Sequence, residues 1–282
     1  MFNYPKDIYA TGLVMLFSCV YSTGSFAVQC GDIIANSQVL TDALSCNDDP
    51  ALTIEGPEGF LVIEGEGSIE CTTNGIGIHM LGRSGVVMGG VVTNCDLGLL
   101  LDGDGSHKVI GVTVEESSSA AIFAQSDGNL IRQSTVSNTT NVIASGLELD
   151  GERNVAVGNN VSGFLEYGIA GFGFYSYIGN NYVENSELGI ILGALVVDGE
   201  SIGASYCVIE SNTVVGSLRT GIGIGAPYTY PNMDNLVTGN TVTGSGNDDI
   251  LDDNEESDCS DGLNVWSNNA ADTSFPSCLK NL

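Results

Sequence analysis

The feature that most constrains this chain is a repeat of two short apolar runs between Gly98 and Asn240. In each unit the first run follows a small residue, and the second closes on Asn or Thr with a large residue after it. Such a repeat, with a period of about 20–30 residues and several short strands per unit, predicts a β-solenoid. The aligned residues of the second run lie 21 to 32 residues apart and are Val114, Val136, Val161, Tyr182, Val214 and Val242.

The apolar runs predict strands rather than helices. They last three to six residues, are rich in Val, Ile and Thr, and end in Gly, Asn, Asp or Ser. A helical repeat would instead place apolar residues three and four positions apart over longer elements. We therefore expect an all-β fold, a single-stranded right-handed parallel β-helix of about eight or nine coils, from near Leu52 to near Trp266.

Two columns of equivalent residues indicate that the coils stack in register. The Asn column predicts a ladder of side-chain amides that satisfies turn backbone groups. It consists of Asn159, Asn180, Asn212 and Asn240. The Gly column indicates a corner that needs a permissive backbone. It consists of Gly98, Gly146, Gly168, Gly189 and Gly221.

Both ends of the chain carry further motifs. The first coil begins Cys30-Gly31-Asp32-Ile33-Ile34, and the last runs from Cys259 through Asn264-Val265-Trp266 to Cys278. With these ends and the repeat between them, the chain resembles secreted parallel β-helix repeat proteins of the pectate-lyase-like superfamily. That superfamily includes lyases, hydrolases, epimerases, phage tailspikes and non-catalytic surface proteins. The resemblance therefore implies a polysaccharide partner, but fixes no reaction.

The N-terminus predicts export. An apolar stretch from Gly12 to Val20 is short for a membrane span, and Ser25-Phe26-Ala27 is a small-x-small cleavage site. We expect a signal peptide at residues 1–27 and one β-helix domain at residues 28–282, secreted or at the cell surface, with no transmembrane segment after cleavage. Leu16-Phe17-Ser18-Cys19 weakly resembles a lipoprotein box, which leaves lipidation at Cys19 as an alternative.

Cleavage after Ala27 leaves seven cysteines, which in an exported protein indicate disulfides and one odd thiol. Three pairings are expected, although spacing alone does not fix them. Cys207 lies in an apolar run and is the candidate buried thiol. The expected pairs are Cys30–Cys46 and Cys259–Cys278 at the two ends, and Cys71–Cys95 between neighbouring coils.

The chain has 35 acidic and 7 basic residues, a formal net charge of −28. This balance excludes nucleic acid as a partner. The acids are explained either by a solvated surface or by Ca²⁺ binding, since carboxylate oxygens are preferred calcium ligands. Neither the EF-hand spacing nor the nonapeptide calcium repeat is present. The candidate metal ligands are Asp248, Asp249, Asp252 and Asp253.

Two coils are longer than the others, and both insertions fall in the same turn of the repeat. The extra residues lie in Gly193–Tyr206 and Gly225–Asn235. Adjacent long loops predict a wall beside a substrate groove, because solenoids carry function on such loops. Tyrosines there can stack on sugar rings or simply cover the core. The candidate substrate-binding residues are Glu152, Arg153, Tyr175, Tyr206, Tyr228 and Tyr230.

The same turn of earlier coils supplies candidate catalytic residues. Asp102 and Asp150 align two coils apart, or about 9–10 Å from strand spacing, near the upper limit for an inverting carboxylate pair. His107 is a candidate acid or base near neutral pH. All three are also ordinary turn residues, so a structural role is the alternative.

Two functions remain open. One is a secreted β-helix that binds extracellular polysaccharide, with or without cleaving it as a lyase or glycoside hydrolase. Scarce basic residues and the missing Asn-Thr-Asp and Gly-His-Gly motifs of polygalacturonases favour binding over catalysis. The other is a non-enzymatic surface or matrix protein with an acidic, cation-binding face.

Overall fold

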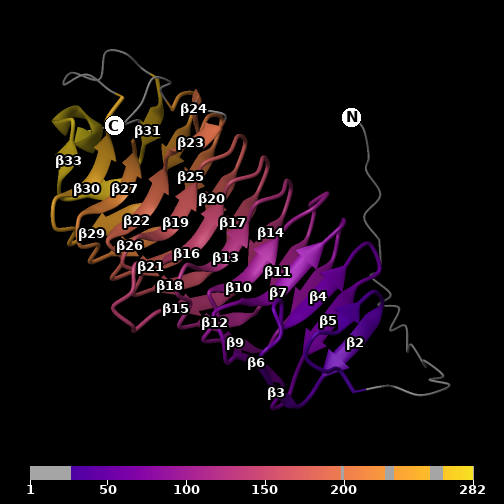
Figure 1. Ribbon diagram of the computed structural model, residues 1–282. Helices are drawn as coiled ribbons and strands as arrows, with labels where there is room; N and C mark the ends of the chain where they lie inside the picture. The colour runs from indigo at the N-terminus through magenta and orange to yellow at the C-terminus, as the bar shows by residue number, and fades with distance from the viewer. Residues whose placement is uncertain (1–26, 198–199, 226–231, 255–262, 282) are drawn as a thin grey trace, which may run out of the picture.

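The computed structural model describes residues 27–197, 200–225, 232–254 and 263–281. Over these residues the chain winds into a parallel β-solenoid of about nine turns. Successive coils stack side by side, so that their strands form three long parallel sheets (Figure 1). The prediction of an all-β parallel β-helix is confirmed. The solenoid also includes a coil before Leu52, formed by β1 to β3.

We name the sheets A, B and C in the order in which each coil enters them. Sheet A consists of β1 (Ile33–Ile34), β4 (Leu52–Glu55), β7 (Ile76–Leu81), β10 (Leu97–Leu101), β13 (Ala120–Ala124), β16 (Ser145–Leu149), β19 (Tyr167–Gly171), β22 (Leu188–Leu192), β27 (Thr220–Ile224), β30 (Asp248–Asp252) and β33 (Ser274–Phe275). Sheet B consists of β2 (Ser37–Leu40), β5 (Phe60–Ile63), β8 (Val86–Met88), β11 (Lys108–Ile110), β14 (Leu130–Arg132), β17 (Val155–Val157), β20 (Tyr177–Gly179), β25 (Val208–Glu210), β28 (Leu236–Thr238) and β31 (Val265–Ser267). Sheet C consists of β3 (Ala43–Cys46), β6 (Ser68–Cys71), β9 (Val91–Thr93), β12 (Thr113–Glu115), β15 (Thr135–Ser137), β18 (Asn160–Ser162), β21 (Tyr182–Glu184), β26 (Thr213–Val215), β29 (Thr241–Thr243) and β32 (Ala270–Ala271).

Three further elements lie outside these sheets. An antiparallel hairpin, β23 (Ala194–Val197) with β24 (Glu200–Gly203), protrudes between β22 and β25. A short 3₁₀ helix, η1 (Ser277–Asn281), follows the last strand. No helix in the described ranges is long and apolar enough to cross a membrane. The predicted signal peptide falls almost entirely within residues 1–26, outside the described residues.

The core of the solenoid is filled by alternate residues of each strand. In sheet A these are pairs such as Leu99 with Leu101 and Ile190 with Leu192, which are fully buried. Sheets B and C each contribute one inward side chain per coil, such as Ile131 and Val136. Because neighbouring coils align residue for residue, the apolar side chains form columns along the molecule, and one continuous core results.

The Gly column lies inside the strands of sheet A and not at a corner. Gly98, for example, follows Leu97 in β10 and has no left-handed backbone. A Cβ atom at Gly98 would collide with the side chain of Val114 from sheet C and with the carbonyl of Ala121 in the next coil. The glycines are therefore needed for close packing between sheets A and C, a different reason from the one predicted.

The predicted Asn ladder is present at the turn between sheets B and C, with one error of register. Asn181, not Asn180, occupies the ladder position, and Val183, not Tyr182, pairs with Val161 and Val214. Asn180 instead adopts a left-handed backbone with an exposed side chain. The error arose because two adjacent asparagines fit the sequence pattern equally well.

Each ladder amide bridges two coils. The Oδ1 of Asn181 accepts hydrogen bonds from the backbone N–H and the Nδ2 of Asn159, at 2.9 and 3.0 Å. The Nδ2 of Asn181 donates to the carbonyl of Ala156 at 3.0 Å. The same bonds recur from coil to coil, so every buried polar atom of these side chains is used. The ladder consists of Asn159, Asn181, Asn212, Asn240 and Asn269.

A second ladder, which the sequence analysis missed, lies just before the strands of sheet B. Asn154 Oδ1 accepts from the backbone N–H and the Nδ2 of Asn129 at 2.9 and 3.0 Å. Asn264 does the same for Asn235. The ladder is interrupted between them, where Ser176 and Cys207 hold the equivalent positions, and this irregularity hid it from pattern analysis.

Disulfides reinforce the N-terminal coils. Cys30 is bonded to Cys46 within the first coil, and Cys71 to Cys95 between neighbouring coils, as predicted. Cys207 is the free, buried thiol, and burial raises its pKa to about 11. Cys278 is also disulfide-bonded. Its predicted partner, Cys259, lies outside the described residues.

Two carboxylates close the C-terminal end. Asp249 accepts hydrogen bonds from the backbone N–H groups of Ser245, Asp272 and Thr273. Asp252 occupies the core column below Ile224 and accepts from Trp266 Nε1 at 2.9 Å and Asn264 Nδ2 at 3.0 Å. Burial raises the pKa of Asp252 despite these bonds. Polar side chains thus enter the core of the last full coil, and β33 stacks on β30 beyond them.

The amide ladder can be tested with two adjacent asparagines. Asn159→Ala removes a buried amide and leaves the backbone N–H of Ser134 without its acceptor. We expect a loss of about 2–4 kcal/mol in the free energy of unfolding, since each buried unsatisfied group costs about 1–3 kcal/mol. Asn160→Ala, at the exposed neighbour, should change it by less than ~0.5 kcal/mol. Chemical denaturation measures both, and equal losses would contradict the ladder's role.

Candidate functional site

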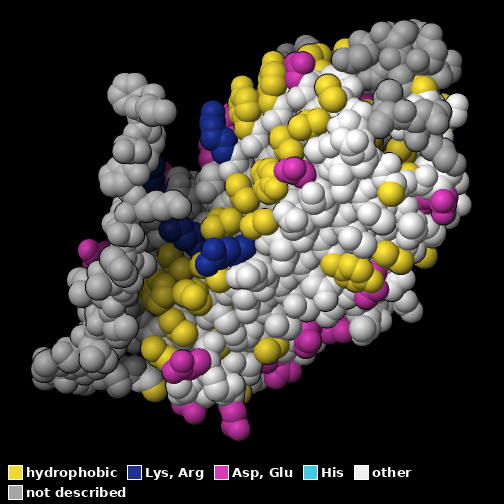
Figure 2. Space-filling model, turned by 180° about the vertical axis from the view of Figure 1, so that it is seen from behind, with side chains coloured by type: hydrophobic (Ala, Val, Ile, Leu, Met, Phe, Trp, Pro, Cys, Tyr) yellow, Lys and Arg dark blue, Asp and Glu magenta, His cyan; other side chains and the backbone are white. Residues whose placement is uncertain are grey.

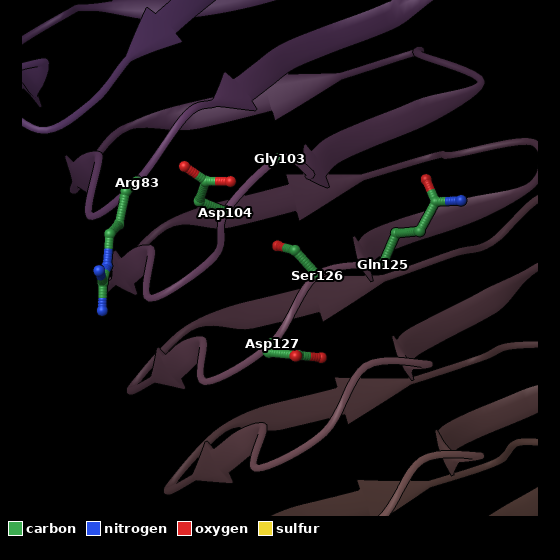
Figure 3. A pocket seen from close by; sticks show the side chains of 6 residues that line it. All are labelled: Arg83, Gly103, Asp104, Gln125, Ser126 and Asp127. Atoms are coloured by element: carbon green, nitrogen blue, oxygen red, sulfur yellow. The ribbon is translucent and has the colours of Figure 1, made fainter.

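The turns that lead from sheet A to sheet B form the most varied edge of the molecule, here called the A–B corner. Both insertions lie at this corner: the β23–β24 hairpin, and the segment between β27 and β28. Their predicted placement in the same turn is confirmed. An open hollow of about 580 Å³ lies farther along it, lined by Arg83, Gly103, Asp104, Gln125, Ser126 and Asp127 (Figure 3).

Asp102 and Asp150 occupy equivalent positions at this corner. Leu101 pairs with Ala124, and Ala124 pairs with Leu149. The next residues along the chain, Asp102, Gln125 and Asp150, therefore follow one another in three successive coils. Two strand spacings put the backbones of the two acids about 9–10 Å apart, as the sequence predicts.

Asp150 lies in an unusual environment for a carboxylate. Its Oδ1 is buried and has no hydrogen-bond partner among the described residues. Burial, and then the nearby charge of Glu148, raise the pKa of Asp150 to about 6. Glu148 lies two residues earlier on the outward face of β16, and burial also raises its pKa. Asp150 is therefore set up to carry a proton in mildly acidic solution.

Asp102 has different neighbours. Its Oδ1 accepts a hydrogen bond from the backbone N–H of Gly103 at 2.6 Å, and its Oδ2 lies 3.4 Å from Nε2 of His79. His79 is on the outward face of β7, one coil before Asp102. The sequence analysis did not assign His79 to the site. His79 aligns with Leu100 of the next coil, two residues before Asp102. This alignment could have assigned His79 to the site.

His107 does not face the surface, which contradicts its predicted availability as an acid or base. Its side chain is fully buried. Nδ1 accepts a hydrogen bond from the backbone N–H of Gly85 at 3.1 Å, so Nε2 donates to the carbonyl oxygen of Asp102 at 2.7 Å. Burial lowers the pKa of His107, which favours this neutral form. His107 holds the turn that carries Asp102 and acts as a positioning residue.

Three predicted binding residues form one stack at the corner. The rings of Tyr175 and Tyr206 lie 5.2 Å apart at an angle of 14°, and the guanidinium of Arg153 lies 5.2 Å from the ring of Tyr175. All three residues have left-handed backbones in successive coils, which aims their side chains outward in the same direction. Both tyrosines are about half exposed.

Glu152 belongs to the same cluster. Its Oε2 lies 2.7 Å from Arg153 Nη1, so the two charges neutralise each other at the surface. The structure thus brings together Glu152, Arg153, Tyr175 and Tyr206. The other predicted stacking residues, Tyr228 and Tyr230, lie outside the described residues.

A second hollow, of about 340 Å³, lies on the outward face of sheet A, toward the turns that enter this sheet from sheet C. It combines the apolar side chains of Leu97, Phe123 and Ile143 with the carboxylates of Glu148 and Glu166. Burial is the main cause of the raised pKa of Glu148. A hydrogen bond from Ser145 lowers this pKa, and the charge of Glu166 raises it. The acidic surface therefore continues from the corner onto this face.

The four predicted calcium ligands differ in their surroundings. Asp249 and Asp252 point into the protein and are bonded to the groups that close the C-terminal end. Asp253 lies at the surface. Partial burial of its carboxylate, and then the charge of Asp248, raise its pKa. Within the described ranges, no group of three or more His, Cys, Asp or Glu side chains is placed to hold a metal ion.

No known family pattern matches the chain, and no curated protein resembles it in sequence. Its fold is similar to that of a mutant tailspike protein of E. coli bacteriophage HK620 in complex with a pentasaccharide, with a TM-score of 0.52 and 15% identity over 76% of this chain and 46% of that one. The Dettilon tailspike protein gives 0.43 and 13%, over 86% and 52%. The A-module of the mannuronan C-5 epimerase AlgE4 of Azotobacter vinelandii gives 0.39 and 13%, over 86% and 75%.

The chain spans about half the length of the tailspike structures it matches. At these identities the likeness concerns the fold alone. The HK620 tailspike shares it, which fits the expected likeness to β-helix repeat proteins. The protein therefore has the parallel β-helix fold that these proteins share.

Proposed function

We propose that the protein is an exported β-helix that binds extracellular polysaccharide at the A–B corner. The observation that carries this proposal is the exposed stack of Tyr175 and Tyr206, extended by Arg153. Flat aromatic surfaces suit the apolar faces of sugar rings. The neighbouring hollow and its carboxylates supply hydrogen-bond acceptors for sugar hydroxyls.

The charge of the corner favours an uncharged glycan over a polyuronate. Asp104, Asp127 and Asp150 lie around the stack and the hollow, on a chain of net charge −28. The positive charge of Arg153 is already matched by Glu152. A polyanion would therefore meet net repulsion along the whole corner. The alternative, a cation-binding matrix protein, is less favoured because Asp249 and Asp252 already have protein donors.

A second candidate function is hydrolysis of the bound glycan, and the environment of Asp150 favours it. A carboxylic acid that keeps its proton can donate it to the leaving glycosidic oxygen, while Asp102 accepts a proton from the water that attacks the anomeric carbon. Such a reaction consumes one water per bond and inverts the anomeric centre. The separation of the two acids is near the upper limit for this mechanism.

Glycan binding can be tested by removing the stack. Tyr175→Asn with Tyr206→Asn deletes both rings while keeping a residue type that tolerates a left-handed backbone. We expect retention in gels containing a neutral polysaccharide to weaken about tenfold or more, since each stacked ring contributes about 0.5–1.5 kcal/mol. Tyr182→Asn, at an exposed tyrosine of sheet C, should leave retention unchanged. Equal retention by all variants, or none by the wild type on any glycan, would refute the proposal.

Hydrolysis is tested by following reducing ends on each glycan that binds. We expect Asp150→Asn and Asp102→Asn each to lower the rate by at least ~100-fold without weakening retention, because they alter proton transfer rather than stacking. A wild type that binds but releases no reducing ends would eliminate this second function and leave binding intact.

The proton on Asp150 is tested without substrate. The fold holds the pKa of this group at about 6, above its ordinary 3.8. Its protonated form therefore stabilises the fold, fully below about pH 4, and this contribution is lost as the pH rises through about 6. Asp150→Asn should raise Tm by about 2–4 °C at about pH 8, and the gain should vanish near pH 4. Exposed Asp104→Asn should show no such dependence. A gain independent of pH would contradict the assignment.

A further inference from the structure

The outward face of sheet B is apolar along most of its length. Most coils present a hydrophobic side chain there, next in line with those of the neighbouring coils. Figure 2, the view from behind, shows this row of hydrophobic side chains along the molecule, with Lys and Arg side chains beside one stretch of it. The row consists of Phe60, Val86, Leu130, Val155, Tyr177, Val208, Leu236 and Val265.

Sheet C shows that this pattern is not a property of the fold. The equivalent outward positions of its strands are mostly polar, and include Thr113, Thr135, Asn160, Thr213 and Thr241. Both sheets have the same inward alternation and the same coil stacking. A long apolar row on one sheet, half-exposed and interrupted only at Lys108, indicates a surface that another molecule covers.

The charges on the outward face of sheet B are few and separated along the sheet. Lys108 lies on β11 and Arg132 on β14, whereas Glu210, on β25, is the one acid at the outward positions of the described strands of this sheet. In the order of the sheet, β11 lies two strands before β17, and β25 lies two strands after it. A two-fold axis at β17 therefore exchanges the positions of β11 and β25.

We propose that two copies of this chain pack face to face through sheet B, antiparallel, with the two-fold axis at β17. Rotation about an axis along the strands reverses the order of coils and keeps the position along each strand. Lys108 of each copy then faces Val208 of the other and lies one outward position from its Glu210. Val155 and Val157 face their own counterparts, so the apolar rows cover each other.

The parallel alternative is disfavoured by the same charges. With the axis along the solenoid, equal coils would face each other. That rotation reverses the strand direction, so Lys108 of one copy would face Ile110 of the other, with Lys108 and Arg132 of the other copy at neighbouring positions. Like charges close together across an interface are unfavourable, whereas the antiparallel arrangement brings opposite charges together twice.

The available area sets the strength of association. With the axis at β17, nine strands overlap; at about 4.8 Å per strand they give a face of about 38 Å, and its outward rows are about 10 Å wide. The contact therefore covers roughly 400 Å² per copy, at the small end of protein interfaces. We accordingly expect a reversible dimer with a micromolar dissociation constant.

Sedimentation velocity over a concentration series tests this proposal on the full mature chain. We expect a monomer–dimer equilibrium in which Glu210→Lys weakens the dimer about tenfold or more, and Lys108→Glu in the same chain restores it. The matched control is Glu184→Lys on sheet C. Glu184 accepts a hydrogen bond from Tyr182, and Glu210 accepts one from Tyr177. Both variants therefore lose a bond from a tyrosine, and only Glu210→Lys should also weaken the dimer.

Cross-linking tests the geometry. Val157→Cys should join two copies through a short bis-maleimide, because it faces itself, whereas Val86→Cys, three strands from the axis, should not. Native Cys207 is buried and should not react. A monomer up to about 100 μM, a dimer weakened equally by Glu184→Lys, or no cross-link at Val157→Cys would each overturn the proposal. These outcomes do not depend on whether glycan binds at the A–B corner.

Discussion

Hydrogen bonds from buried asparagine side chains to the neighbouring coil are the interaction on which this structure depends. Parallel strands alone leave the register between coils open, because a shift by two residues keeps the same faces inside. Asn181 removes that freedom, since its amide contacts both a backbone N–H and a backbone carbonyl of the preceding coil. The close approach of Gly98 to the carbonyl of Ala121 in the next coil acts in the same way, because a Cβ atom at Gly98 would collide with that carbonyl.

The two ladders also explain where the solenoid tolerates variation. They lie on either side of sheet B, so the strand between them is fixed at both ends. The A–B corner lies upstream of the second ladder, and extra residues leave there without disturbing the stacked amides that follow. The β23–β24 hairpin leaves the coil at this corner. After the hairpin the chain rejoins the coil at Tyr206, whose ring stacks on that of Tyr175. The residues of the A–B corner can thus vary in number and type while the amide ladders keep the strands of sheet B in position.

The sequence predicted the solenoid well because its columns are local and repeated. Each glycine of the predicted Gly column, from Gly98 to Gly221, is the second residue of a strand of sheet A. The prediction of the ladder residues failed where two adjacent residues of the same type fit one position of the pattern. Two adjacent asparagines at Asn180 and Asn181 fit equally, and only burial distinguishes them.

The candidate site was less predictable for a physical reason. Alignment of coils places residues such as Asp102 and Asp150 in one line, but it does not say which side chains turn inward. His107 was expected to be available and is buried, because its backbone lies at the second ladder, where side chains point into the protein. His79, three-dimensionally adjacent to Asp102, carries no motif at all.

The way the solenoid ends has a consequence for its behaviour at high concentration. A stack of parallel coils offers open strand edges at both ends, and such edges are templates for fibril growth. Here the first coil is cross-linked by Cys30–Cys46. Near the other end, the carboxylate of Asp252 lies in the core column and accepts hydrogen bonds from Trp266 and Asn264. These bonds hold the strands of both end regions in place, which leaves their edges less free to pair with another chain.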